Sequence, residues 1–260
     1  MTRPANNSLI TGVQCYLQGL RLLNTAGLRA YILWPLCINT LLFAALIYVG
    51  IDRFDALLAW LLPDIFAWLR WLLWPIFALT ALLVVFYAFA LFANLIAAPF
   101  NGMLAEAVEI HLRGVDAVPA FSWSTLLRQM PSMISAELAK LLYFTVRALP
   151  LLLLFLIPGV NLVAPLVWLA FCAWLLALEY LDYPMGNHGI LFKAQRAHLK
   201  AYRGGVFGFG SAALLMTLIP VVNFLAMPAA VAGATALWTR ISADRNSADA
   251  GSSGQSRLPT

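Results

Sequence analysis

The sequence predicts an all-helical integral membrane protein. Of its 260 residues, 63% are hydrophobic and 10% are charged, whereas ordinary soluble domains carry about 25% charged residues. The charged residues also leave four long gaps, since none occurs in residues 30–51, 71–105, 148–178 or 204–239. About 20 apolar residues cross a bilayer as a helix, and backbone polar groups in hydrocarbon must be paired within the protein. These runs are therefore expected to be helical and to lie in a membrane.

The net charge and the cysteines limit further which class of protein this sequence can encode. The chain has 16 basic and 11 acidic residues, a formal net charge of +5. In so apolar a chain this excess indicates a membrane surface rather than nucleic acid. Cys15, Cys37 and Cys172 are widely spaced among apolar residues and predict neither a disulfide framework nor a metal site. The sequence shows no glycine-rich phosphate loop, no zinc-type cluster and no recognisable Ser–His–Asp order, so we expect no cofactor and no enzymatic activity.

The first expected element is an amphipathic helix over residues 8–23. Its apolar side chains recur at helical spacing with polar ones opposite; the apolar set is Leu9, Val13, Tyr16, Leu17, Leu20 and Leu23. Such a helix is expected to lie in the membrane interface. Residues 30–51 and 71–98 follow as two spanning helices, the second long enough that it must tilt or protrude. Residues 99–147 are expected to form a cytoplasmic helical segment.

The last two uncharged runs contain proline breaks and are expected to fold as re-entrant hairpins over residues 148–178 and 206–239. Pro158 interrupts the third run, and Pro220 and Pro228 interrupt the fourth. As a helix, residues 148–157 reach about 15 Å, half of a hydrocarbon core of about 30 Å. The alternative is six plain spans with kinks in the last ones.

The two breaks also resemble each other. Leu156–Ala164 aligns with Leu218–Ala226, and six of the nine positions are identical. Paired interrupted segments point to a transport site. If both runs turn back, the basic segments around them share the cytoplasmic side with the N-terminus, as the positive-inside rule prefers. Residues 1–241 are thus one membrane domain, and residues 242–260, rich in Ser, Gly, Asp and Arg, are expected to be a disordered tail.

Three places are candidates for chemistry. Before the first span, Asn24 or Thr25 can cap a helix whose free N–H groups, with the guanidinium of Arg29, form a small anion site. The alternative is a helix cap with a snorkelling arginine. After the second span, Glu106, Glu109 and Arg113 share one helix face. This face is either a pore mouth or a solvated surface with an ion pair at positions i and i+4.

The third place is the set of polar residues at membrane depth, namely Asn39, Asn94, Asn161 and Asn223, with a polar group at residues 179–188 that includes Glu179 and His188. Amides are costly to bury in lipid and should face protein or water. They either line a permeation path or join helices together, and the polar group at residues 179–188 either contributes to that path or caps a helix end.

Several stretches, in their order and spacing, carry a family resemblance. They are Gly27-Leu28-Arg29, Trp34–Asn39, Ala97–Glu106, Ile157-Pro158-Gly159, Asp182-Tyr183-Pro184, Asn187-His188 and Gly233–Trp238. From about Gly12 to Trp238, the sequence resembles the CysZ sulfate permeases of the bacterial inner membrane. The resemblance implies two long transmembrane helices, two partly penetrating hairpins, homo-oligomers, and sulfate uptake that supplies cysteine synthesis.

The resemblance also implies site residues. It places sulfate at Gly27, Leu28 and Arg29; some members have a second arginine next, where this chain has Ala30. Near the pore it places Pro99, Phe100, Asn101, Glu106 and Arg113.

Moving a dianion inward against about 100 mV costs about 4.6 kcal/mol. Without an ATP motif, a sulfate gradient, intracellular consumption or co-transported protons must meet this cost, so the mechanism is channel-like or proton-linked. Candidate coupling groups are Glu106, Glu109, Glu179 and His188. The competing hypotheses are a non-transporting membrane scaffold, a transporter of another oxyanion such as sulfite or thiosulfate, and a membrane-embedded enzyme.

Overall fold

The computed structural model describes residues 7–31, 33–34, 37–38, 40–42, 44–45, 48–49, 75–76, 79–80, 82–83, 100–114 and 123–255. These residues are helical apart from short turns, and they include no strand. They fall into two units, one formed by Met1–Arg29 with Asn101–Thr260 and the other by Ala30–Phe100.

In the unit Ala30–Phe100, every described residue is helical. The two spans predicted over residues 30–51 and 71–98 otherwise lie outside the described residues, as do the candidate site residues Asn39, Asn94 and Pro99. Phe100 is described, helical and half-buried.

In the other unit, helix α1 covers Leu9–Leu22, so the helix predicted over residues 8–23 is confirmed. Ser8 caps it, because its Oγ accepts a hydrogen bond from the N–H of Ile10 at 3.2 Å. The side of α1 that packs against α7 and α8 differs from the predicted leucine stripe. It consists of Gly12, Cys15, Tyr16, Gly19 and Leu22, while Leu9, Val13 and Leu17 are exposed.

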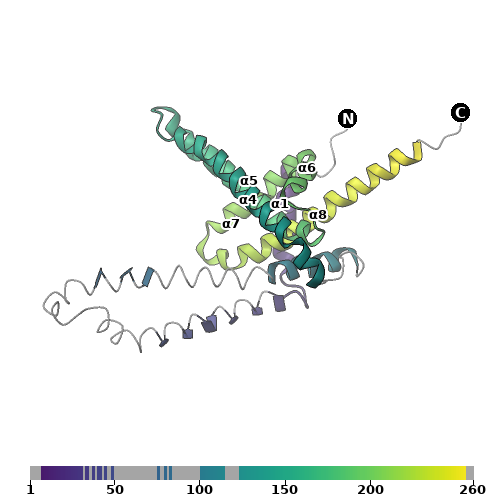
Figure 1. Cartoon of the computed structure of the whole chain (residues 1–260), viewed down its shortest axis with the longest axis horizontal. Coiled ribbons are helices and arrows are strands. Elements are labelled where there is room, and N and C mark those ends of the chain that lie inside the picture. The colour runs from purple at the N-terminus through teal and green to yellow at the C-terminus, as the bar shows by residue number, and fades with distance from the viewer. Residues whose placement is uncertain are drawn as a thin grey trace. The chain divides into compact units, whose positions relative to one another are not determined.

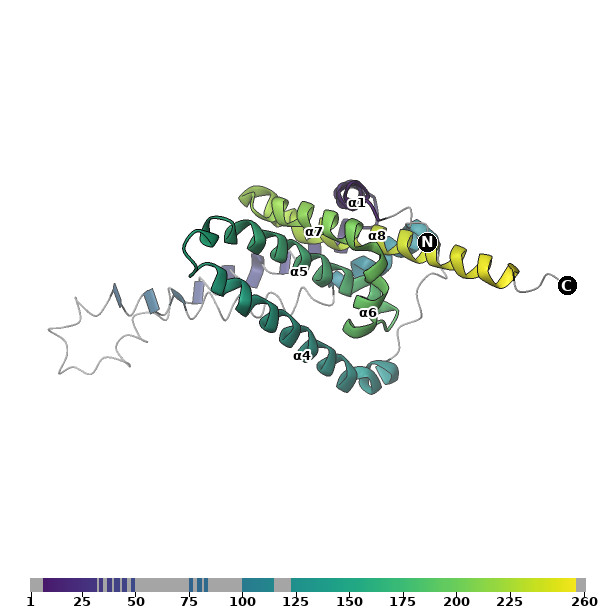
Figure 2. The ribbon, with the colours of Figure 1, turned by 90° about the horizontal axis from the view of Figure 1, so that it is seen from above.

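Helices α4 (Trp123–Leu154) and α5 (Ala164–Asn187) form a pair joined by a turn at residues 155–163 (Figures 1 and 2). The turn contains Gly159 at φ 85° and the short 3-10 helix η3 (Val160–Leu162). The helix break predicted at Pro158-Gly159 is therefore confirmed. Within the pair, Ser135–Leu156 and Ala164–Asn187 are long and apolar enough to cross a membrane.

The predicted bounds of this hairpin, residues 148–178, are wrong, since its helices begin at Trp123 and end at Asn187. The charged residues that limited the apolar run do not end the helices. Instead, Lys140 on α4 forms an ion pair with Asp182 on α5 at 2.9 Å, so the hairpin continues past them. Most of the second half of the expected segment 99–147 thus belongs to α4.

After α5 come helix α6 (Phe192–Leu199), the 3-10 helix η4 (Lys200–Tyr202), helix α7 (Arg203–Thr217) and helix α8 (Pro220–Gln255). A break lies at Pro220 as predicted, but α8 continues through Pro228 and past residue 239, so the predicted bounds 206–239 are too narrow. The tail predicted from residue 242 is likewise helical up to Gln255. The Ser242 hydroxyl bonds the carbonyl oxygens of Trp238 and Thr239, which extends the helix across the expected boundary.

The two aligned breaks adopt different conformations. At the first, α5 begins only at Ala164; at the second, α8 begins at Pro220 itself. The difference lies at the residue after the proline. Gly159 takes a positive φ, which a β-branched residue resists, and its counterpart is Val221. Proline at the first helical position is favourable, so the second break is a tight junction.

Candidate functional site

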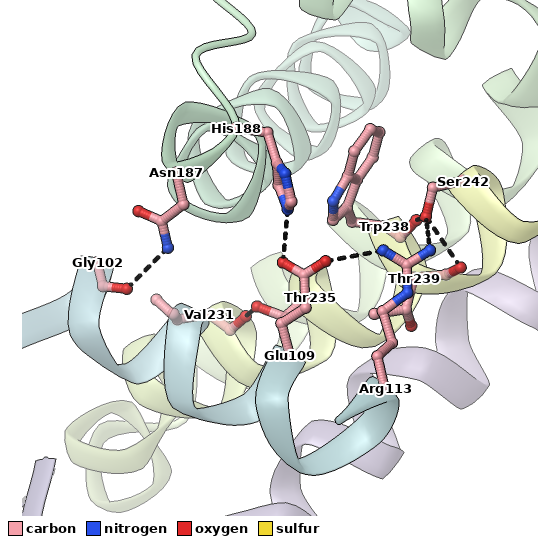
Figure 3. A network of polar contacts seen from close by, with 10 residues as sticks. All are labelled: Gly102, Glu109, Arg113, Asn187, His188, Val231, Thr235, Trp238, Thr239 and Ser242. Carbon is pink, nitrogen blue, oxygen red and sulfur yellow. Dashed lines mark hydrogen bonds and ion pairs between the residues drawn. The ribbon is translucent and has the colours of Figure 1, made fainter. Parts of the chain in front are cut away.

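The described polar contacts of the site converge on Glu109, which lies on the helical segment of residues 101–113. Its side chain is 0% exposed. Its Oε1 receives the guanidinium Nη1 of Arg113 at 2.8 Å, and its Oε2 lies 2.9 Å from Nε2 of His188 (Figure 3). His188 is the residue that ends α5. The predicted pair of Glu109 with Arg113 is confirmed, and α5 supplies a third member to it.

Arg113 connects this group to α8. Its Nη2 donates to Oγ of Ser242 at 2.6 Å, so one guanidinium holds a carboxylate on one side and a hydroxyl on the other (Figure 3). We call Glu109, Arg113, His188 and Ser242 the polar junction. With His188 neutral the junction has one positive and one negative charge, and a proton taken up by His188 makes it net positive.

Trp238 on α8 adds an unused donor beside the junction. Its ring centroid lies 5.8 Å from that of His188 and 6.4 Å from that of His198. The indole is 5% exposed, and its Nε1, on the side of the ring that faces His188 in Figure 3, has no hydrogen-bond partner among the described residues. A buried donor without a protein acceptor is suited to bind a water molecule or a small anion.

A second group of contacts ties the start of the same helical segment to α5 and α8. The Asn101 amide donates to the hydroxyl of Tyr183 at 3.4 Å and contacts Sδ of Met227 at 3.9 Å. Asn187 donates to the carbonyl oxygen of Gly102 at 3.0 Å (Figure 3). Asn101 is therefore buried between helices, while Glu106 on the same segment is half-buried.

Glu179 lies in a separate cluster around Lys140. The Lys140 ammonium is 2.9 Å from Glu137, 3.2 Å from Glu179 and 2.9 Å from Asp182, and Lys140 is 5% exposed. Sequence reasoning missed Lys140 as a site residue. Its signal was the Glu137–Lys140 spacing of three residues, which places both side chains on one helix face.

The segment Gly27-Leu28-Arg29 forms a turn after α1. The Arg29 guanidinium folds back on Asn24, donating to its carbonyl oxygen at 3.2 and 2.9 Å and to its side-chain oxygen at 2.6 Å. Gly27 has φ 95°, and the N–H of Leu28 bonds the carbonyl oxygen of Thr25 at 3.2 Å. The expected set of converging free N–H groups is thus corrected at Leu28, whose N–H is used within the turn.

The comparisons with known proteins agree on one family. Residues 15–228 match the family described as Sulfate transporter CysZ/Etoposide-induced protein 2.4. A relative from Pseudomonas fluorescens (strain Pf0-1), named Sulfate transporter CysZ, is 45% identical over 235 residues, 89% of this chain and 94% of the relative. A relative of the same name from Pseudomonas aeruginosa (strain PAO1) is 44% identical over 91% of this chain and 97% of the relative. Another, from Salmonella typhimurium (strain LT2), is 40% identical over 88% of this chain and 91% of the relative.

Proposed function

The chain belongs to the family of the sulfate transporter CysZ and the etoposide-induced protein 2.4, and from this premise we propose that it carries sulfate across the bacterial inner membrane. In this reading it is a multi-pass homo-oligomer that supplies sulfur for cysteine synthesis without ATP. The observation that carries the proposal is the polar junction, because a fully buried carboxylate with arginine and histidine partners is costly in an apolar protein. Such groups mark ion pathways in membrane proteins.

Sulfate first binds at the turn of Gly27, Leu28 and Arg29. Arg29 is exposed, and its present partner is the neutral Asn24. Hydrogen bonds from a guanidinium to an anion are roughly twice as strong as bonds between neutral groups. A sulfate dianion therefore competes well with Asn24 for Arg29, and Gly27, which holds a positive φ, leaves the turn without a Cβ at that point.

The polar junction then compensates the charge of the transported anion. Glu109 and His188 share a contact of 2.9 Å, and Arg113 balances the charge of the same carboxylate. Uptake of a dianion with two protons is electroneutral, which removes the cost of about 4.6 kcal/mol at 100 mV. A channel-like mechanism driven by the sulfate gradient needs no such exchange, and the two are separated by the pH dependence of flux.

The turn between α4 and α5 and the turn between α7 and α8 both expose apolar side chains, which supports the insertion of these turns into lipid. At the first, Leu156 is 76% and Leu162 81% exposed; at the second, Leu218 is 62% exposed. Large apolar side chains this exposed at two turns are unusual on a water-facing protein. We propose that both turns dip into the bilayer and return to the same side, and that the exposed leucines of α1 rest in the interface.

Radiolabelled sulfate uptake into proteoliposomes tests the function. Wild-type protein should take up sulfate above protein-free liposomes, and Arg29→Ala should weaken sulfate binding and slow uptake. An imposed pH gradient, acidic outside, should accelerate uptake if protons are coupled. Absence of sulfate-dependent flux from a well-folded protein would support the scaffold instead, and faster uptake of thiosulfate or sulfite would assign another oxyanion.

A further inference from the structure

Tyr143 on α4 is contacted by two arginines from different helices. The guanidinium carbon of Arg147 lies 3.7 Å from the centre of the Tyr143 ring, and that of Arg196 on α6 lies 4.1 Å from it. Arg147 also donates to the carbonyl oxygen of Tyr143 at 3.5 Å. The two helices therefore bring two positive charges to one tyrosine ring.

The two charges are not balanced by the protein around them. Within the described ranges, the ion pairs involve Arg113, Lys140 and His188, and neither Arg147 nor Arg196 lies within ion-pair distance of a carboxylate. Both side chains are exposed. Each guanidinium gains about 0.5–1 kcal/mol from the ring, but the two positive charges repel each other, and a bound anion would offset that repulsion.

Arg147 and Arg196 lie next to an apolar surface. From residue 148 to residue 178 the chain has no charged residue, and the side chains of Leu149, Leu152 and Leu153 are all about half exposed or more. Tyr143 packs on Phe192 at 5.4 Å and accepts a hydrogen bond from Nε1 of Trp174 at 3.3 Å. Tyrosine and tryptophan gather where hydrocarbon meets lipid headgroups, so the aromatic surroundings of Arg147 and Arg196 are typical of that boundary.

We propose that Arg147 and Arg196 bind the phosphate of an anionic phospholipid headgroup and thereby fix how deeply the tip of the α4–α5 pair enters the bilayer. Arginine suits phosphate because its planar donors bind two oxygens at once, and basic pockets between membrane helices bind such headgroups. This site rests on the proposed partial insertion of the α4–α5 tip and is independent of sulfate transport.

Native mass spectrometry of the full-length protein in non-ionic detergent tests the site, with dioleoyl-phosphatidylglycerol as the probe and dioleoyl-phosphatidylcholine as the neutral comparison. Wild-type protein should retain phosphatidylglycerol in preference to phosphatidylcholine. Arg147→Ala with Arg196→Ala should weaken retention by about 25-fold, since each basic residue near an anionic surface is worth roughly fivefold. Lys200→Ala, an exposed cation just after α6, is the matched control and should bind as the wild type does.

Added inorganic phosphate or sulfate separates a lipid site from a free-anion site. Persistence of phosphatidylglycerol binding in their presence supports the lipid headgroup; its displacement by equimolar phosphate or sulfate overturns the proposal in favour of a free oxoanion. Equal lipid retention by the wild type and the double variant also overturns it. Folding of the double variant is checked by its elution volume and thermal transition. Because lipid retention is measured without flux, its failure would leave the sulfate uptake experiment intact.

Discussion

The Glu109 carboxylate is fully buried, and each of its oxygens has a different partner. Removing one member of a buried ionic group leaves an uncompensated charge and costs about 3–5 kcal/mol. Glu109→Ala strands Arg113, which is only partly exposed, so we expect a loss of about 3 kcal/mol in the free energy of unfolding, measured by thermal unfolding in detergent. A transition unchanged from the wild type would contradict the structural role of the carboxylate.

Glu106 provides the matched comparison, because it lies three residues earlier and is half-buried. Substitutions at partly exposed positions usually change stability by about 0.5 kcal/mol or less. We therefore expect Glu106→Ala to unfold close to the wild-type temperature while slowing sulfate uptake in proteoliposomes. Normal uptake by a folded Glu106→Ala variant would remove this residue from the transport path.

Tyr16 on α1 makes stability depend on pH in the alkaline range. Burial raises the pKa of its hydroxyl to about 12, above its ordinary value of about 10. Since the unfolded chain loses this proton first, the contribution is complete below about pH 10 and is lost as the pH rises towards 12. The wild type should therefore lose roughly 2 kcal/mol more than Tyr16→Phe over this range. Parallel pH curves for the two proteins, from denaturant unfolding, would exclude the effect.

At the residue scale the sequence predicted contacts within one helix and missed those between helices. The spacing of Glu109 and Arg113 indicated an ion pair because four residues make one helical turn. Nothing in the sequence placed His188 against Glu109, since the two are far apart in the chain and only packing of α5 brings them together. Lys140 was missed for the same reason, because its partners Glu179 and Asp182 come from another helix.

At the element scale, glycines allow α1 to touch α7 and α8 backbone to backbone. A Cβ added to Gly12 would collide with the carbonyl oxygen of Gly205 and the N–H of Phe209, and one added to Gly19 would collide with Ala229. The periodic leucines predicted the helix but not its packed face, because close approach needs small residues. Of the residues that defined the pattern, Leu9, Val13 and Leu17 are exposed, whereas Tyr16 is fully buried.

This packing makes Gly12→Ala a sharp test of the α1 contact. Overpacking a tight interface costs about 1–3 kcal/mol, so we expect a clear fall in the thermal transition. Gly186→Ala is the control, since a Cβ there meets nothing within 4 Å and alanine favours helix over glycine. If both variants unfolded at the same temperature, α1 would not be held in this position.

Prolines predicted two of the helix breaks, whereas charge patterning predicted the helix ends poorly. Pro158 lies in the turn after α4 and Pro220 begins α8, positions that suit a residue without a backbone donor, whereas α8 continues through Pro228. The sequence predicted that the hairpin ends at charged residues, yet Lys140 and Asp182 lie inside helices and form an ion pair with each other. A hydropathy pattern does not show that two charged residues on different helices pair with each other. The helices of the predicted hairpin were therefore too short.

At the scale of the whole molecule, the α4–α5 pair either crosses the bilayer or enters it part of the way and returns. The apolar stretches of α4 and α5 are each long enough to cross a bilayer, but Arg147 is exposed within the first of them. An exposed arginine at the bilayer centre is costly. If Arg147 instead lies at the interface, the helix beyond it, which ends at Leu154, reaches about 10 Å, about a third of a core of about 30 Å.

Depth measurement at the turn distinguishes these readings. A fluorophore on Leu162→Cys, with Cys15, Cys37 and Cys172 replaced, should be quenched most strongly by lipids labelled near the ends of their acyl chains. A membrane-impermeant maleimide should fail to reach that cysteine from either side, and should reach a control cysteine at the exposed Ser135 from one side only. Labelling of the turn from the side opposite to residue 135 would show a full crossing. In that case Arg147 would lie within the hydrocarbon, where an exposed arginine is costly.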